Sequence, residues 1–128
     1  MKNKLRTITV DEVIYAYKLE MRIADRMCIN ELRVFRKELK VHPLNISILT
    51  WDDPIMGSPL NTGIVLGHAG CPKGEVYNLN YPKRIREWIL YGQSLGWDGS
   101  QTVEVEDGLA AMRTIGYFTA ALEPKGLD

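Results

Sequence analysis

The feature that most constrains the fold of this chain is an apolar stripe at helical spacing in its second half. The apolar positions fall at i, i+3, i+4 and i+10 and are Ile85, Trp88, Ile89 and Leu95. Residues at this spacing share one face of a helix, which must pack against another element. Gly92 lies on the same stripe and lets another backbone approach closely, at a cost of about 1 kcal/mol in helix propensity. We expect core packing to cover the stripe, although a partner protein could bind the same residues.

Both ends of this helix are marked in the sequence. Pro82 suits the first helical position, where its missing N–H has no partner within the helix. Gly96 fits the left-handed residue that follows many helices, and Trp97 can fold back as the hydrophobic residue beyond it. The sequence therefore predicts a helix from Pro82 to Leu95.

The first half of the chain alternates with a period of two, which is typical of a strand that buries one face. The apolar face of the segment from 13 to 21 consists of Val13, Tyr15, Tyr17, Leu19 and Met21. The segment Arg6–Val10 comes before it, and Asp11-Glu12 forms a short break between the two. These features predict a β-hairpin, although the break lacks the glycine that favours tight hairpin turns. A helix that begins at Thr9 or Asp11 is the alternative.

Further strands are indicated by the same alternation. Leu32–Val41 mixes apolar and charged side chains on both faces, so a strand and a charged helix are both compatible with it. Asn45–Trp51 is a clearer strand, and Glu75–Leu79 and Gln101–Val105 are short candidates. Short connections between the early strands favour an antiparallel meander with one covered face.

The segment Asp53–Lys73 differs in composition from the rest of the chain. It contains three prolines and four glycines around one apolar run, Ile64-Val65-Leu66. Loops of more than about 12–15 residues are uncommon in compact domains and are often functional. We therefore predict a long loop here that contains a short edge strand.

Together these elements predict a single α+β domain that spans residues 1–128. Its antiparallel sheet has about five strands, and the main helix packs across one face of that sheet. A second short helix from Asp107 to Ile115, capped by Asp107 and ended by Gly116, packs at the edge of the sheet.

Two segments of the chain resemble small uncharacterised bacterial proteins. The first is the N-terminal hairpin motif ITVDEVIY at residues 8–15, and the second is the Pro-helix-Gly-Trp segment NYPKRIREWILYGQSLGWD at residues 80–98. Together they cover about a quarter of the sequence. Such proteins resemble products of mobile gene cassettes of the integron type. The resemblance implies a sheet followed by a helix, and it implies no catalytic residue.

The charges of the chain are balanced. Sixteen basic residues stand against sixteen acidic ones, so the formal net charge is zero. Nucleic-acid binders normally carry a basic excess that displaces counterions from phosphates, so we expect no nucleic-acid partner. A near-neutral surface opposes association only weakly, which is consistent with a homo-oligomer, in the simplest case a homodimer.

The sequence also indicates where the protein works. No apolar run follows the basic N-terminus, and no stretch approaches the ~20 apolar residues that a membrane helix needs. We therefore expect a cytoplasmic protein with no membrane partner. The two cysteines, Cys28 and Cys71, lie far apart in the sequence, and free thiols are the expected state in a reducing cytosol.

The pair His68 and Cys71 is the first place to look for catalysis, because a histidine can draw the proton from a thiol. No third group that would orient the imidazole is recognisable, so a loop histidine and a packed thiol explain the pair more simply. The scattered histidines and cysteines also lack the paired spacing of zinc ligands. We therefore predict no catalytic residue, no metal site and no cofactor.

Six residues are candidates for a ligand pocket between the sheet and the 53–73 loop: Tyr15, Tyr17, Trp51, Asp52, Asp53 and His68. A tryptophan beside carboxylates can bind a small polar or cationic molecule, although Asp-Asp-Pro is more often a turn. A small-molecule-binding protein or an unrecognised enzyme is therefore the alternative function. The function predicted first is a non-enzymatic binding or protein-interaction module that forms a homodimer, because the sequence has many aromatic residues and no catalytic or metal constellation.

Overall fold

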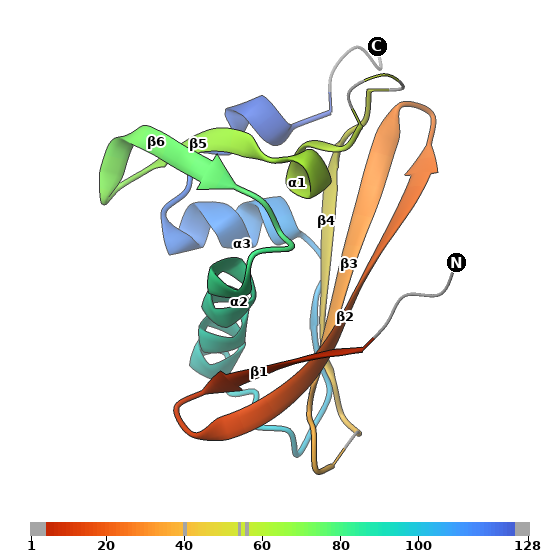
Figure 1. Ribbon diagram of the computed structural model, residues 1–128, viewed down its shortest axis with the longest axis vertical. Helices are drawn as coiled ribbons and strands as arrows, with labels where there is room; N and C mark the ends of the chain where they lie inside the picture. The colour runs from red at the N-terminus through yellow and green to blue at the C-terminus, as the bar shows by residue number, and fades with distance from the viewer. Residues whose placement is uncertain (1–4, 40, 54, 56, 125–128) are drawn as a thin grey trace.

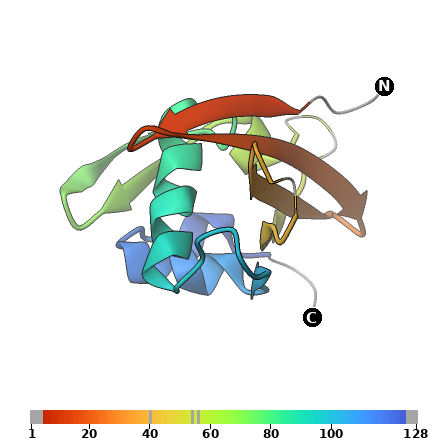
Figure 2. The same cartoon turned by 90° about the horizontal axis from the view of Figure 1, so that it is seen from below.

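The chain folds into a curled sheet with its main helices on one side (Figure 1 and Figure 2). The structure is a computed structural model that describes residues 5–39, 41–53, 55 and 57–124. The strands are β1 (Arg6–Val10), β2 (Val13–Ala24), β3 (Met27–Arg36), β4 (Leu44–Trp51), β5 (Ile64–His68), β6 (Cys71–Tyr77) and β7 (Val103–Val105). The helices are α1 (Pro59–Thr62), α2 (Pro82–Ser94) and α3 (Gly108–Ile115), followed by a short 3-10 helix (Ala120–Leu122).

The strands form one five-stranded sheet in the order β1-β2-β3-β4-β7 and a separate hairpin of β5 and β6. The first four strands are antiparallel neighbours, whereas β7 runs parallel to β4. Figure 1 shows α2, α3 and the β5–β6 hairpin on the same side of the large sheet. The predicted α+β class, the sheet of five strands and the helix across one face are therefore confirmed.

The N-terminal hairpin is confirmed, and the alternative helix is wrong. β1 and β2 meet at Asp11 and Glu12, whose φ angles of 50° and 68° are the left-handed values of a tight hairpin turn. Aspartate adopts this conformation more readily than most residues, which explains a turn without glycine. Tyr15 and Tyr17 are only 5% and 3% exposed, as the period of two predicts.

The strand predicted over Leu32–Val41 is shifted in the structure, because β3 begins at Met27 and ends at residue 36. The early part of β3 is hidden in the sequence by Asn30, a polar residue that is fully buried. Its side-chain Nδ2 donates to the carbonyl oxygen of Ile48 at 2.9 Å and to Thr50 Oγ1 at 3.3 Å. An amide that is satisfied by the next strand interrupts the apolar alternation without disrupting the sheet.

The short edge strand predicted around Ile64-Val65-Leu66 is confirmed as β5, but the long loop predicted around it is wrong, because much of Asp53–Lys73 belongs to α1, β5 and the start of β6. Glycines inside the strands hide the β5–β6 hairpin in the sequence. Gly74 has a φ angle of 91°, and a Cβ there would press on Val65 and Leu66 of the paired strand. The strand therefore requires glycine at a position where an alternating pattern would otherwise be recognised.

The remaining strand predictions hold with changed boundaries. Asn45–Trp51 is confirmed as β4, with one more residue at its start. The strand predicted at 75–79 begins earlier, at Cys71, and ends at Tyr77. The strand predicted at 101–105 is the shorter β7.

The main helix is confirmed as α2, and its apolar stripe is buried except at one end. Three residues of the stripe are 0% exposed: Ile85, Trp88 and Ile89. Leu95 lies just beyond the helix and is 48% exposed, so it does not belong to the stripe. A Cβ at Gly92 would overlap the side chain of Leu44, which confirms the close approach of α2 to the sheet.

The end of α2 and the start of α3 are formed by the residues predicted for them. Gly96 has a φ angle of 96°, and the N–H of Trp97 donates to the carbonyl oxygen of Gly92 at 2.9 Å. Asp107 caps α3, because its Oδ1 accepts the N–H of Ala110 at 3.0 Å. Within the described part of the chain, no helix has the length and apolar character needed to cross a membrane.

Candidate functional site

The five-stranded sheet has one covered face and one open face. In the residue ranges that the structure describes, α2, α3 and the β5–β6 hairpin all lie on the covered side, and no helix or strand lies over the other (Figure 1). Side chains alternate across a strand, so every second residue belongs to the uncovered side. We call this surface the open face, and its residues include Thr7, Thr9, Ile14, Ala16, Lys18, Glu20, Arg22, Ile29, Glu31, Arg33, Phe35, Asn45, Ser47, Leu49, Glu104 and Glu106.

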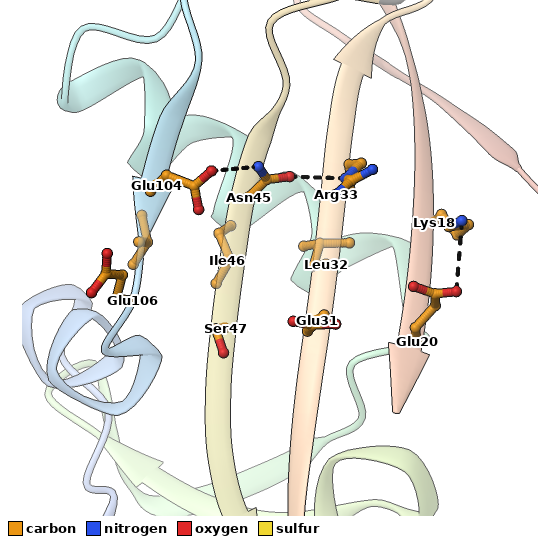
Figure 3. Close-up of a pocket in the computed structure, with 11 residues that line it drawn as sticks. Lys18, Glu20, Glu31, Leu32, Arg33, Asn45, Ile46, Ser47, Glu104 and Glu106 are labelled. Carbon is orange, nitrogen blue, oxygen red and sulfur yellow. Dashed lines mark hydrogen bonds and ion pairs between the residues drawn. The ribbon is translucent and has the colours of Figure 1, made fainter. Parts of the chain in front are cut away.

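Two rows of polar side chains cross the middle of the open face (Figure 3). The first row runs across four strands and consists of Lys18, Arg33, Asn45 and Glu104. Arg33 Nε donates to Asn45 Oδ1 at 3.0 Å, and Asn45 Nδ2 donates to Glu104 Oε2 at 2.7 Å. The strand register sets the two cations, Lys18 and Arg33, directly opposite each other. The first row is therefore basic on β2 and β3.

The second row lies beside the first, two residues away on β2, β3 and β4 and just past the end of β7, and consists of Glu20, Glu31, Ser47 and Glu106 (Figure 3). The register sets Glu20 directly opposite Glu31. Like charges that are directly opposite in a sheet are destabilising. The two rows thus sort the charges of β2 and β3 by sign instead of alternating them.

Only part of this charge is neutralised by neighbouring side chains. The two rows line a shallow hollow of about 280 Å³. Lys18 Nζ lies 3.6 Å from Glu20 Oε2, and Arg22 Nη2 lies 3.0 Å from Glu31 Oε2. Arg33 makes no ion pair with any other described residue, and its hydrogen bond goes to the neutral amide of Asn45.

Apolar side chains flank the two rows along the strand direction. Beyond the first row, Phe35 is half-buried and Ile14 is 48% exposed. Beyond the second row, Ile29 is half-buried opposite Leu49, which is 41% exposed. The open face is therefore a charged band between two apolar ends.

A second polar cluster lies on the β5–β6 hairpin. His68, Cys71 and Glu75 place their ligand-type atoms within 4.8 Å of one another. His68 and Cys71 are register partners at the end of the hairpin, and His68 Nε2 lies 3.7 Å from Glu75 Oε1. Glu75 was not among the candidates predicted from the sequence, because only the hairpin register brings it beside His68.

The hydrogen bonds of this cluster fit an ion-pair network better than a metal site. Glu75 Oε1 lies 3.0 Å from Arg84 Nη2 and 3.3 Å from Lys83 Nζ, and these hydrogen bonds lower the pKa of Glu75. His68 Nδ1 accepts the N–H of Gly70 at 3.2 Å, which places the proton of a neutral imidazole on Nε2. Both cations contact the same carboxylate oxygen, Glu75 Oε1, so a metal ion at this cluster would bind beside two positive charges.

Arg84 anchors the same network in the interior, where it is only 2% exposed. Its Nη2 donates to the carbonyl oxygen of Val76 at 2.9 Å, and its Nη1 donates to Tyr117 Oη at 2.7 Å. The guanidinium carbon lies 4.8 Å from the ring centroid of Tyr77. Burial and the carboxylate of Glu87 raise the pKa of Tyr117, whose hydroxyl donates to Glu87 Oε1 at 2.6 Å. These contacts join β6, α2 and the segment after α3, which is a structural role.

The residues of the predicted ligand pocket lie in three separate environments. Tyr15 and Tyr17 belong to the buried core, where the Tyr15 hydroxyl accepts from Gln93 Nε2 at 3.1 Å. His68 packs against Tyr117 with ring centroids 5.4 Å apart, on the β5–β6 hairpin.

Trp51, Asp52 and Asp53 form the third environment, at the end of β4. Trp51 Nε1 donates to the carbonyl oxygen of Ala121 at 2.6 Å, and Asp52 Oδ1 accepts from Ser58 Oγ at 3.0 Å. The structure thus brings these three neighbours together and places His68 in a different cluster. A ligand pocket that uses all six residues stays a prediction.

Both cysteines are free thiols, as predicted. Cys28 is 0% exposed, and its burial raises the pKa of the thiol above the ordinary value. Cys71 Sγ lies 3.8 Å from the carbonyl oxygen of Gly74, to which the thiol donates. A thiol with a raised pKa is a weak nucleophile near neutral pH, so Cys28 is a packing residue.

Comparison of the chain with protein-family models, with curated proteins and with solved structures finds no match. The resemblance to bacterial gene-cassette proteins therefore stays a prediction, and the geometry of the open face is what bears on function.

Proposed function

We propose that this protein is a non-enzymatic protein-interaction module that self-associates through the open face of its sheet. The observation that carries the proposal is a sheet face with exposed apolar ends and a charged middle, opposite the side on which α2, α3 and the β5–β6 hairpin pack. Protein interfaces combine apolar contacts with polar groups in this way, and the charged pairs fix the orientation of the partner.

The lining of the hollow between the rows supports a protein partner over a small ligand. Most of the residues around this hollow are polar or charged, and they lie across the broad surface of four strands. Small-molecule pockets are mostly apolar, with only a few polar groups. A partner surface as broad as the sheet can contact both apolar ends and both rows at the same time.

The second polar cluster supports the non-enzymatic part of the proposal. Its carboxylate, Glu75, is engaged by Arg84 and Lys83, and the imidazole of His68 accepts a backbone hydrogen bond. A general base needs a free acceptor atom within reach of its proton donor. The described contacts of the cluster therefore hold the hairpin to α2.

Leu49→Asp tests the proposal at one apolar end of the open face. We expect the wild-type chain to have a solution mass above the 14.6 kDa of one chain at micromolar concentration. A carboxylate at position 49 would be buried without a partner in the interface, so the dissociation constant should rise about tenfold or more. Sedimentation equilibrium measures both values.

Val65→Asp is the matched control, because Val65 is 59% exposed on β5 and lies outside the open face. We expect this variant to associate like the wild type. A wild-type chain that stays at 14.6 kDa, or a Leu49→Asp variant that associates normally, would contradict the proposed function.

A further inference from the structure

We infer that the open face binds a second copy of this chain face to face. The two copies are related by a two-fold axis that runs across the strands and passes over β3 between Glu31 and Arg33. The inference rests on the proposed function and specifies the register of the two sheets. In this register, the first row of each copy lies over the second row of the other copy on β2, β3 and β4.

The outward residues of β3 carry a self-complementary pattern. They read apolar, acidic, basic and apolar in the order Ile29, Glu31, Arg33 and Phe35. A two-fold axis between the two charged residues lays this series on itself in reverse, as an isologous interface requires. Arg33 then faces Glu31 of the second copy, and Phe35 faces Ile29 of the second copy. Each charge meets the opposite sign, and each apolar side chain meets another apolar side chain.

The neighbouring strands follow the same axis. On β2, Lys18 belongs to the first row and Glu20 to the second, so Lys18 faces Glu20 of the second copy. On β4, Asn45 faces Ser47 of the second copy, and neither of these side chains is charged. Three adjacent strands therefore agree on one register.

A second copy in this register would offset electrostatic repulsion that is present in the isolated chain. Lys18 lies opposite Arg33 and Glu20 lies opposite Glu31, and both are like-charged pairs that weaken a lone sheet. A second copy that is offset by one row covers each of these pairs with charges of the opposite sign. Arg33, which makes no ion pair with another described residue, then faces a carboxylate.

A two-fold axis parallel to the strands is the competing register, and it is disfavoured by the second row. That axis would lay each row on the same row of the second copy. The second row contains three carboxylates and no cation, so Glu20 would face Glu106 of the second copy. The axis across the strands has one kind of like-charged contact, Glu104 over Glu106, which occurs twice in the dimer at the edge of the sheet, where solvent and salt screen charges.

The proposed packing follows the geometry of aligned sheets. Aligned sheets pack about 10 Å apart with their strands within about 30° of each other. β3 is the central strand of the sheet, so an axis on β3 keeps β2 and β4 in contact on both sides. A standard interface covers about 800 Å² of each partner, which is about a tenth of the 7635 Å² surface of this chain.

Charge reversal followed by mixing tests the register. Arg33→Glu makes both charges of the outward β3 series acidic, and Glu31→Arg makes both basic. Each variant alone places like charges across the interface, so we expect its dissociation constant to rise about tenfold or more. An equimolar mixture should form a mixed dimer with roughly the wild-type affinity, because the acidic strand of one variant faces the basic strand of the other. Sedimentation equilibrium with a fluorescent label on one variant measures the mixed dimer.

Control variants separate this effect from general charge and from unfolding. Arg86→Glu and Glu123→Arg change exposed charges outside the open face, at 51% and 52% side-chain exposure, and should leave association unchanged. Thermal denaturation of Arg33→Glu should show no loss of monomer stability, because the variant removes the repulsion from Lys18. The milder Arg33→Gln should weaken association by less than Arg33→Glu does.

Selective formation of the mixed dimer would establish the register. Variants that associate like the wild type, or a mixture that associates no better than either variant alone, would overturn it. In that case a Leu49→Asp variant that still dissociates would keep the proposed function and reject only the register. A wild-type chain that is monomeric at all concentrations would reject both.

Discussion

Glu75 adds charged contacts between two elements that are also joined by hydrogen bonds from Arg84 to Val76 and from Trp88 to Tyr77. Its carboxylate accepts hydrogen bonds from Arg84 at 3.0 Å and from Lys83 at 3.3 Å, which links β6 to the start of α2. Arg84 is 2% exposed, so its charge depends on the carboxylates around it. Removing one partner of a buried charge costs more than the pair itself contributes, because the other charge stays without compensation.

Acid is expected to weaken the fold through this carboxylate. The hydrogen bonds from Arg84 and then Lys83 hold the pKa of Glu75 below its ordinary value of 4.5. A carboxyl group with a lowered pKa stabilises the folded state at pH values above its ordinary pKa, and this contribution is lost as the pH falls through the lower folded-state value. The unfolding free energy of the wild type should therefore fall as the pH drops below 4.5, and Glu75→Gln should lose part of this pH dependence.

Urea denaturation of both proteins across acidic pH measures the difference. The wild type and the variant share every other titrating group, so the difference between their profiles isolates Glu75. Parallel profiles would contradict the link between Glu75 and the buried guanidinium of Arg84.

The contact between α2 and β4 fixes the covered side of the sheet. Gly92 faces Leu44 so closely that a Cβ would overlap the leucine side chain. Immediately after the helix, Trp97 is 1% exposed, and its Nε1 donates to the carbonyl oxygen of His42 at 3.0 Å. The helix is therefore held to the sheet by a glycine on its packed face and a tryptophan just beyond its end.

Gly92→Ala is expected to destabilise the protein even though alanine favours helices. The substitution gains about 1 kcal/mol in helix propensity, but overpacking against Leu44 typically costs about 1–3 kcal/mol. The net loss should lie between about 0 and 2 kcal/mol in urea denaturation. Leu90→Ala, on the exposed side of the same helix at 37% exposure, is the control and should change stability much less. A stabilised Gly92→Ala variant would show that Leu44 yields without cost.

Elements with local sequence marks could be predicted, and elements that depend on distant partners could not. α2 is marked by its stripe, its first proline and its final glycine, all within one segment. β3 is hidden because Asn30 is satisfied only by the next strand, and β6 is hidden because Gly74 leaves its alternation incomplete. In each missed case a long-range contact, not local propensity, decides the structure.

The open face could be predicted only in part for the same reason. The mixed charges of residues 32–41 indicate a strand that is not buried on both sides. The rows arise because the register sets Lys18 beside Arg33 and then Asn45 beside Glu104, which come from four different strands. Likewise His68 and Cys71 are visible in the sequence, whereas the hairpin is needed to place Glu75 with them.

The molecule as a whole combines a formal net charge of zero with charges that are sorted on one face. Zero net charge removes the overall repulsion between copies, and the sorted rows give one face a preferred orientation. In the proposed assembly, the apolar ends supply affinity and the rows supply the register.

Salt is expected to weaken self-association. The screening length falls from about 10 Å at 0.1 M to about 3 Å at 1 M ionic strength, so the facing rows attract each other less as sodium chloride is added. The dissociation constant of the wild type should rise with salt, and Arg33→Gln should show a smaller rise because it has lost one charge pair. Sedimentation equilibrium over a range of salt concentrations measures both slopes. Tighter association at high salt would show that apolar contacts alone govern the interface.

If the proposed dimer forms, the like-charged neighbours on β2 and β3 make the stability of the fold depend on the protein concentration. A solitary molecule keeps Lys18 against Arg33 and Glu20 against Glu31, whereas the second copy of the proposed dimer would offset both repulsions with charges of the opposite sign. Heat resistance would then climb with protein concentration, because association favours the native state by mass action. At low cellular concentration a larger fraction of the protein would be monomeric, and the protein would therefore unfold at a lower temperature.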